Sequence, residues 1–408
     1  MSSQLTAFRY VATDLISGQL LADTIPLNVE SFTMQLNGGG SLSGQLNLDS
    51  DYSINAPFLE ALECRRAVLW VLADGWPVWS GVVWDWPDMS RANGTLPVTA
   101  QTLDSVFNYR LISTTLEYGA VTPVDIFTVF IDLVNYGCTK TSPYMLPPSL
   151  SPVQGPASPL VAQQAAIANL VLPTGAAAVS GITWQASYLY SDLGSVGSAF
   201  SDLVTGGNIE YAFVPGLTAD GQLCTNLLLA ANGLGRDYPE SGYSVVYPGN
   251  ASDYGFQRQG SQSTNYVWAV APPNGSAVQW ESQYPHGVDL ADLEAGYPLM
   301  ESTVTWQGST VTAQSQVDTY ADGQMALLTQ ALTMPVINIP DGQYPRLTDL
   351  VLGDVFPFAA TSPIHPPATS GEPGYQNLVR LTGWTCFPPG PQQSPYVQLN
   401  TSAILAVP

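Results

Sequence analysis

Hydrophobic and polar residues alternate over most of the first hundred positions, a spacing that is typical of half-buried β-strands. The clearest hairpin joins a continuous apolar run at 67–73 to a returning strand at 76–86 through the turn Asp74-Gly75. The same alternation predicts further strands before and after this hairpin, at 5–13, 19–22, 32–36, 42–48 and 96–102.

Three later segments instead repeat their apolar residues at helical spacing. The first begins near Pro123 and ends at Gly137, and the second spans 192–204 before Gly206-Gly207. The third begins behind Asp318 as N-cap and stops before Pro335. Two shorter helices are also predicted, over 162–172 and over 56–64 with Pro57 in its first turn.

Period-two patterning returns beyond the second helix. It predicts strands at 182–188, 209–214, 223–230, 244–247, 265–271, 278–280, 303–306, 378–387 and 396–405. Behind the third helix, Ile337 and Ile339 predict one strand and the run 350–358 a second, with Asp341-Gly342 as a turn. This region therefore predicts a helix followed by a hairpin.

The composition favours a mainly β protein, α+β overall. The 408 residues include 36 glycines and 33 prolines, which indicates many turns between short strands. A chain of this length holds several domains. The patterns divide it into a β-rich segment at 1–110, an α+β segment at 111–215, a second β-rich segment at 216–316 and a closing helix-plus-strand unit at 317–408.

The charge is strongly acidic, with 32 Asp and Glu against 10 Lys and Arg and a net charge of −22. Lys140 is the one lysine. This balance argues against a nucleic-acid grip and against docking on anionic membranes. No apolar run is long enough to span a membrane and no targeting segment precedes the first strand, so the sequence predicts a soluble protein made in a cytoplasm.

Candidate catalytic groups are sparse. His286 and His365 both adjoin prolines, and no G-x-S-x-G accompanies them. The triplet Gly38-Gly39-Gly40 lacks the spacing of a nucleotide-binding loop, and Lys140 follows no P-loop. Four scattered cysteines without a C-x-x-C pair indicate reduced thiols and no zinc site, at Cys64, Cys138, Cys224 and Cys386. The sequence predicts no catalytic, cofactor-binding or metal-ligating residue and no enzyme.

Two features keep a sugar-binding or glycoside-hydrolase protein open as an alternative. Carboxylates cluster at Asp289, Asp292 and Glu294 and again at Asp85 and Asp88, and glycosidases work with two acids. The hairpin at 67–86 also carries five tryptophans, which either pack across strands or bind sugars: Trp70, Trp76, Trp79, Trp84 and Trp86.

Four motifs resemble the baseplate hub and tail-tip minor tail proteins of phages. The helix D-x-Y-A-x-G-x-x-A-L-L at 318–328 precedes L-x-L-G-D-V at 350–355. The strand V-W-S-G-V-V-W with Ser80-Gly81 precedes the stretch that holds Asp104. S-V-G-S-A-F-S-D-L followed by G-N-I-E-Y-A-F resembles the small α+β domain of hub proteins of myophage and siphophage tail tips.

This resemblance implies two tube-like β-barrels with small α+β insertion domains. It also implies a structural virion protein, a homotrimeric ring at the phage tail tip. The implied partners are a distal tail protein, a tape measure protein and fibre or spike proteins. DNA would pass through the lumen without specific binding, which acidic walls favour. A hexameric distal tail ring protein is a further alternative.

Overall fold

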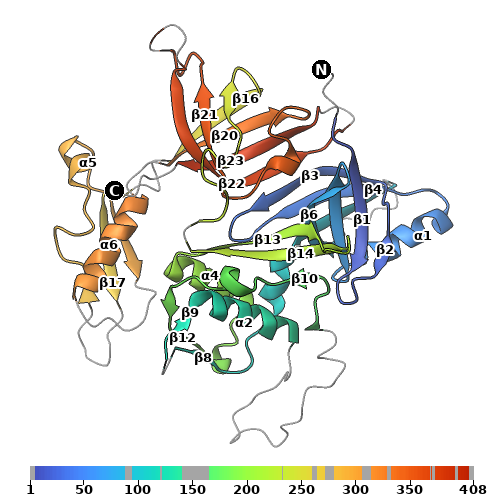
Figure 1. Ribbon diagram of the computed structural model, residues 1–408, viewed down its shortest axis with the longest axis horizontal. Coiled ribbons are helices and arrows are strands. Elements are labelled where there is room, and N and C mark those ends of the chain that lie inside the picture. The colour runs from blue at the N-terminus through green and yellow to red at the C-terminus, as the bar shows by residue number, and fades with distance from the viewer. Residues whose placement is uncertain are drawn as a thin grey trace, which may run out of the picture. The chain divides into compact units, whose positions relative to one another are not determined.

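The computed structural model describes residues 5–87, 94–119, 122–139, 165–231, 233–259, 264–271, 280–305, 314–328, 332–367, 369, 373–390 and 394–403. The chain forms two compact units (Figure 1). The larger unit combines Met1–Tyr254 with Ile337–Thr401, and the smaller one consists of Gly255–Val336 and Ser402–Pro408. The predicted division into four segments stays a prediction. Among the described residues, no helix is both long and apolar enough to cross a bilayer.

One sheet holds most of the strands, which confirms the mainly β prediction. Its thirteen strands are β1 (Phe8–Asp14), β2 (Leu20–Ala22), β3 (Leu27–Gln35), β4 (Ser41–Asn47), β5 (Ala67–Ala73), β6 (Trp76–Asp85), β7 (Thr95–Thr102), β15 (Val245–Tyr247), β16 (Asp253–Gln259), β20 (Leu332–Pro340), β21 (Val355–Ala360), β22 (Tyr375–Phe387) and β23 (Tyr396–Ala403). They run in the order β16-β20-β23-β22-β3-β4-β7-β6-β5-β1-β2, with β21 between β22 and β15. The described strands form no closed barrel, so the two barrels stay a proposal.

The hairpin of β5 and β6 forms where the sequence predicts it. Asp74 and Gly75 have φ angles of 51° and 88°, which fits a tight turn whose twist matches the strands. Every residue of β5 is buried, because both of its faces are covered. Val68, Trp70 and Leu72 face one core, and the alternate residues face the other side of the sheet.

β22 connects parts of the chain that are far apart in sequence. Its first half pairs with β21, from Val355 opposite Arg380 to Ala360 opposite Tyr375, and its second half pairs with β3. The predicted hairpin behind the third helix is therefore wrong. The turn at Asp341 exists, but β20 pairs with β16 and β23, while β21 pairs with β15 and β22. Leu350-Val351-Leu352 is no strand and follows a 3-10 turn, η5 (Leu347–Asp349).

A second layer in the larger unit contains two of the predicted helices, α2 (Ile126–Thr139) and α4 (Val196–Gly207). It also includes η1 (Leu103–Tyr109), η2 (Gly175–Ala178), η3 (Tyr190–Asp192), β8 (Leu116–Tyr118), β9 (Val124–Asp125), β10 (Leu170–Val171), β11 (Thr183–Trp184), β12 (Ala186–Tyr188), β13 (Glu210–Leu217) and β14 (Leu223–Ala230). β13 and β14 form a long hairpin between α2 and α4 on one side and β1–β7 on the other (Figure 1). The prediction at 162–172 falls partly outside the described residues, and the described part contains β10.

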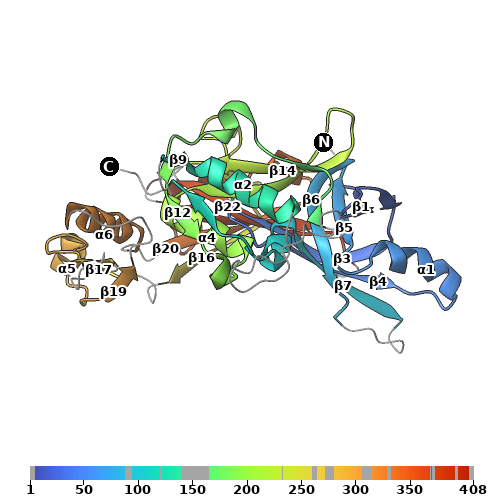
Figure 2. The same cartoon turned by 90° about the horizontal axis from the view of Figure 1, so that it is seen from below.

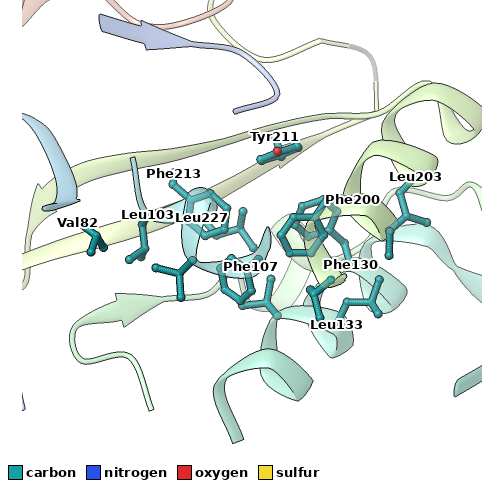
Figure 3. Packing of buried hydrophobic residues seen from close by; sticks show 14 of the residues in the cluster. Val82, Leu103, Phe107, Phe130, Leu133, Phe200, Leu203, Tyr211, Phe213 and Leu227 are labelled. Atoms are coloured by element: carbon teal, nitrogen blue, oxygen red, sulfur yellow. The ribbon is translucent and has the colours of Figure 1, made fainter. Parts of the chain in front are cut away.

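Stacked aromatic rings fill the core between these layers (Figure 3). Phe130 of α2 and Phe200 of α4 lie parallel, with ring centroids 4.2 Å apart. Phe107 of η1 contacts Phe200, and Tyr211 of β13 contacts Phe130. Phe130 and Phe200 are apolar positions of the two predicted amphipathic helices, so the buried faces of these helices are confirmed.

Four helix starts differ from the prediction. α2 begins at Ile126, behind the strand β9, and α4 begins at Val196 with Ser195 as its N-cap. The other two are those of α1 (Tyr52–Ala61) and α6 (Gln314–Leu328).

α1 begins four residues early because Asp51 accepts a hydrogen bond from Ser53 N, and Pro57 lies inside it. α1 lies beyond β1–β7, on the side away from α2 and α4 (Figure 2). α6 (Gln314–Leu328) also begins before its predicted cap, so Asp318 is inside the helix. Its carboxylate instead accepts hydrogen bonds from Gln283 N and Gln314 Nε2.

The smaller unit packs α6 on a three-stranded sheet. β17 (Tyr266–Ala271) lies between β18 (Trp280–Glu281) and the parallel strand β19 (Glu301–Thr305). Ala269 and Ala271 face Val317 and Ala321 of α6 in a small core. Asn265 is buried and ties the sheet to the short helix α5 (Leu290–Glu294) through Asp292.

Candidate functional site

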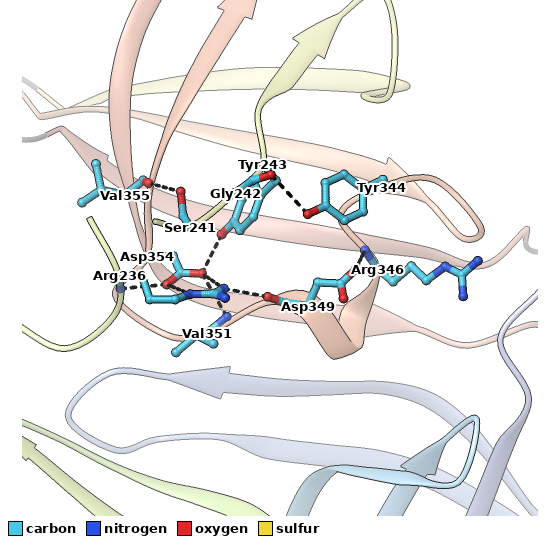
Figure 4. A network of polar contacts seen from close by, with 10 residues as sticks. All are labelled: Arg236, Ser241, Gly242, Tyr243, Tyr344, Arg346, Asp349, Val351, Asp354 and Val355. Carbon is cyan, nitrogen blue, oxygen red and sulfur yellow. Dashed lines mark hydrogen bonds and ion pairs between the residues drawn. The ribbon is translucent and has the colours of Figure 1, made fainter. Parts of the chain in front are cut away.

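An Arg–Asp pair anchors the segment after β14 to the C-terminal strands in the larger unit (Figure 4). The Asp354 carboxylate is fully buried and accepts hydrogen bonds from Arg236 N at 2.9 Å and Arg236 Nε at 3.0 Å. Tyr243 donates its hydroxyl proton to the same carboxylate at 3.2 Å, and Arg236 Nη2 also reaches Asp349 O. The hydrogen bonds to Asp354 raise the pKa of Arg236.

A second ion pair lies between β13 and β22. Arg380 donates from Nη1 and Nη2 to the two oxygens of Glu210 at 2.6 Å each, and Leu234 N donates to the same carboxylate at 2.8 Å. Burial by itself raises the pKa of Glu210. The hydrogen bonds from Arg380 and Leu234 outweigh burial, and the net result is a lowered pKa. Glu210 is therefore ionised at neutral pH and holds β13 against β22.

The two pairs meet where two backbones approach closely. Gly353 has a φ of 90°, and a Cβ on it would lie 1.9 Å from Leu234 O. Arg380 Nε donates to Gly353 O and Arg380 Nη2 to Leu234 O. The glycine and the aspartate of L-x-L-G-D-V thus have distinct structural roles, since Gly353 admits the neighbouring chain and Asp354 binds it.

An apolar pocket of about 430 Å³ opens beside these ion pairs. Trp76 at its wall is 63% exposed, and Leu228 and Val351 are also exposed. Its other walls include Leu234, Leu347 and Trp384. The lining holds no histidine or cysteine, so its chemistry suits contact with apolar groups of another molecule.

The two histidines lie in different environments and in different units. His286 Nδ1 is 2.8 Å from Asp322 Oδ2 of α6, in the smaller unit. His365 Nδ1 is 3.3 Å from the hydroxyl of Tyr254, which also bonds Ser362, in the larger unit. Each has a local structural partner, and the described contacts assemble no Ser-His-Asp triad.

The predicted carboxylate cluster forms a helix cap. Asp289 caps α5 by accepting from Asp292 N, and Asp292 accepts from Asn265 Nδ2 at 2.9 Å. Glu294 is the last residue of this helix. Asp85 ends β6 and is exposed, and Asp88 lies outside the described residues. The cap accounts for the proximity of Asp289 and Asp292 without a glycosidase pair.

The remaining candidates serve packing and turns. The four cysteines are free, and burial raises the pKa of each thiol, that of Cys138 to about 11. Asp104 accepts from Gly39 N at 3.2 Å, which fixes the glycine turn. A Cβ on Gly81 would lie 2.3 Å from Gln101 O, so this glycine allows β6 and β7 to approach. Within the described part of the chain, no three His, Cys, Asp or Glu side chains group as metal ligands, and Lys140 is not described.

The tryptophans of the hairpin are committed to separate partners. Four donate their indole N–H inside the protein: Trp70 to Thr13 Oγ1, Trp79 to Thr33 O, Trp84 to Ser105 Oγ and Trp86 to Leu62 O. Trp76 alone among the five is an exposed side chain. This arrangement favours packing over a sugar-binding platform.

No pattern in the sequence indicates the two ion pairs. Glu210 and Arg380 are 170 positions apart, and Arg236 and Asp354 are 118 apart, so no local pattern joins them. The scarcity of bases was the one usable signal. With 10 basic residues against 32 acids, each buried arginine has a specific reason to be there.

The fold is that of phage tail proteins. The sequence matches no family model, and no curated protein matches it. Among solved structures, the tail protein from Neisseria meningitidis MC58 is 13% identical with a TM-score of 0.51, covering 97% of both chains. The 43 kDa tail protein of prophage MuSo2 from Shewanella oneidensis is 9% identical with a TM-score of 0.53, covering 97% of this chain and 98% of that one.

A chain from a different kind of assembly shares the fold as well. A chain of the Francisella PdpA-VgrG complex is 8% identical with a TM-score of 0.52, and the match covers 98% of this chain but 58% of that one. The resemblance to tail hub proteins drawn from the motifs is thus confirmed at the level of the fold.

Proposed function

We propose that this protein is a structural component of a phage tail tip, a baseplate hub that forms a homotrimeric ring. The observation that carries the proposal is the fold match to two prophage or bacterial tail proteins over nearly the full length of each chain. A match from end to end supports a shared architecture for the whole protein, beyond one widespread domain.

The ring would join the end of the tail tube to distal tail, tape measure, and fibre or spike proteins. Acidic walls would repel DNA phosphates, and the net charge of −22 supports a lumen that DNA passes without adhering. The apolar pocket with the exposed Trp76 supplies one contact surface for such a neighbour. The protein would act without catalysis and would be part of the virion.

The mass of the purified protein in solution tests the ring. Light scattering over a concentration series should give three times 43.4 kDa at the upper concentrations. A hexamer would favour the distal tail ring instead. Gold-labelled antibody against the protein should mark the tip of assembled tails in electron micrographs, and labelling along the tube or on the capsid would refute the proposed location.

A further inference from the structure

A second pocket in the larger unit contains two arginines that form no ion pair with any carboxylate in the described part of the chain. It has a volume of about 430 Å³ and lies between the end of β6 and the end of η1. Its lining consists of Leu15, Arg65, Trp84, Asp85, Val106, Tyr109 and Arg110. In the described part of the chain, ion pairs join other arginines to Asp14, Asp23, Glu210 and Asp354, but none involves Arg65 or Arg110.

Arg110 is the unusual member of this pocket. Its Nε atom is buried and has no hydrogen-bond partner. Burial lowers the pKa of its guanidinium, and the opposing influence comes from the thiol of Cys138, not from a carboxylate. A guanidinium nitrogen that is buried and unbonded is unfavourable to a fold, and an anion that arrives from outside the chain would supply the missing partner.

The aromatic wall indicates the kind of ligand. Tyr109 is 71% exposed, and its ring lies 4.7 Å from that of Trp84. Leu111 and Leu193 are exposed nearby, since Ile112 N bonds Gly194 O and Leu111 pairs with Ser195. Tryptophan, tyrosine and arginine are the residues that dominate protein–protein contacts. A free ion would use the arginines but would leave this apolar rim uncovered.

The local charge of the pocket indicates which kind of molecule binds there. Arg65 and Arg110 exceed Asp85 by one positive charge, in a chain whose net charge is −22. Another copy of this chain presents many carboxylates, since 32 acids face 10 bases. A local positive pocket on an acidic protein is complementary to the acidic surface of the same protein.

We propose that the pocket lined by Trp84, Tyr109, Arg65 and Arg110 receives an aspartate or glutamate side chain from a second copy of this chain. This inference rests on the proposed function, because it assigns a contact to the proposed ring. The entering carboxylate pairs with the Arg110 guanidinium, and the surrounding segment covers the Tyr109 ring.

Replacing Arg110 by methionine distinguishes a role of this side chain in assembly from a role in folding. In Arg110→Met the buried charge is lost and most of the side-chain volume is kept. We expect the Tm of dilute, dissociated protein to stay the same or rise, while association weakens about tenfold or more. Arg9→Met is the matched control, since Arg9 is an exposed arginine paired with Asp23 at 3.5 Å and the charge change is identical.

The second copy is identified by cross-linking. A photoreactive phenylalanine analogue at Tyr109 should give a cross-linked dimer whose peptide from the other copy contains an acidic residue. Converting that acid to lysine in an Arg110→Glu background should restore association, which a purely structural arginine would not allow.

The possible failures are distinguishable. If the wild-type protein and Arg110→Met assemble equally, the pocket assignment is overturned and the ring proposal stands. If the wild-type mass stays at 43.4 kDa at every concentration, assignment to a second copy is overturned as well. A saturable Tm increase in succinate together with unchanged assembly of Arg110→Met would show a small-anion site instead.

Discussion

Arg380 holds Glu210 by two parallel hydrogen bonds of 2.6 Å across 170 positions of the chain. About a fifth of each side chain is exposed, so the pair is shielded from much of the solvent that weakens surface ion pairs. It joins the β13 hairpin to β22, the strand that also pairs with β3 and β21. This one contact therefore links the two layers of the larger unit.

We expect a double-mutant cycle of Glu210→Gln and Arg380→Met to give a coupling energy of about 1–3 kcal/mol in unfolding free energy. Because the pair is bidentate and partly buried, its coupling energy should exceed that of exposed ion pairs. Urea denaturation followed by tryptophan fluorescence measures it. The exposed pair Arg9–Asp23 is the control, with an expected coupling below about 0.5 kcal/mol, and equal couplings for the two pairs would contradict the prediction.

Asp354→Asn should destabilise the larger unit by about 3–5 kcal/mol. The substitution preserves shape but leaves the Arg236 guanidinium facing a neutral amide, and the amide cannot accept from Arg236 and Tyr243 as the carboxylate does. Chemical denaturation of the variant gives the value. A loss below about 1 kcal/mol would mean that solvent reaches this carboxylate, contrary to its complete burial.

Gly353→Ala should cost about 3 kcal/mol or more, because the new methyl group would lie 1.9 Å from Leu234 O at a φ of 90°. Gly75→Ala distinguishes the effect of the close contact from the effect of the positive φ angle. Gly75 has a φ of 88° but no atom within 4 Å of its would-be Cβ, so it should lose only about 1–2 kcal/mol. If both variants lose the same free energy, backbone strain alone explains Gly353.

The ion pair of His286 and Asp322 makes the smaller unit pH-dependent. The hydrogen bond that His286 donates to the Asp322 carboxylate raises the pKa of His286 above its ordinary value of 6.5. Because the folded-state pKa exceeds that of the unfolded chain, the stabilisation is complete below about pH 6.5 and is lost as pH rises through the folded-state pKa.

NMR titration of the His286 ring provides the measurement. In wild-type protein the midpoint should exceed that of the Asp322→Asn variant, whose histidine should titrate near 6.5. Equal midpoints for His286 in the two proteins would exclude a role for Asp322.

How far the sequence predicted the fold depended on the range of each contact. The hairpin of β5 and β6 was predictable because its turn and both strands are contiguous, and β14 (Leu223–Ala230) was placed at its observed bounds. The aromatic faces of α2 and α4 followed from helical spacing alone.

Strand partners were not predictable in the same way. A period of two tells which side chains face a core but not which strand lies alongside. The strand at 337–340 and that at 355–358 therefore looked like a hairpin around Asp341, although β15 and β22 flank β21. The contacts of Arg236 and Arg380 required coordinates, since their partners are distant in sequence.

Replacing each of two tryptophans of β6 by alanine should destabilise the protein to very different extents. Trp79 is fully buried, and its indole N–H donates to Thr33 O, so Trp79→Ala should cost about 3–5 kcal/mol of unfolding free energy. Trp76 is 63% exposed at the apolar pocket, and Trp76→Ala should change stability by less than about 0.5 kcal/mol. Urea denaturation measures both. Because the two residues lie three positions apart on β6, strand propensity is matched and burial remains the difference.

If Trp76→Ala also reduces binding of a hydrophobic dye while stability is kept, the pocket is an open apolar surface, as a contact site for a tail neighbour requires. A large stability loss in Trp76→Ala would instead make this side chain part of the core and remove that surface from the proposed assembly.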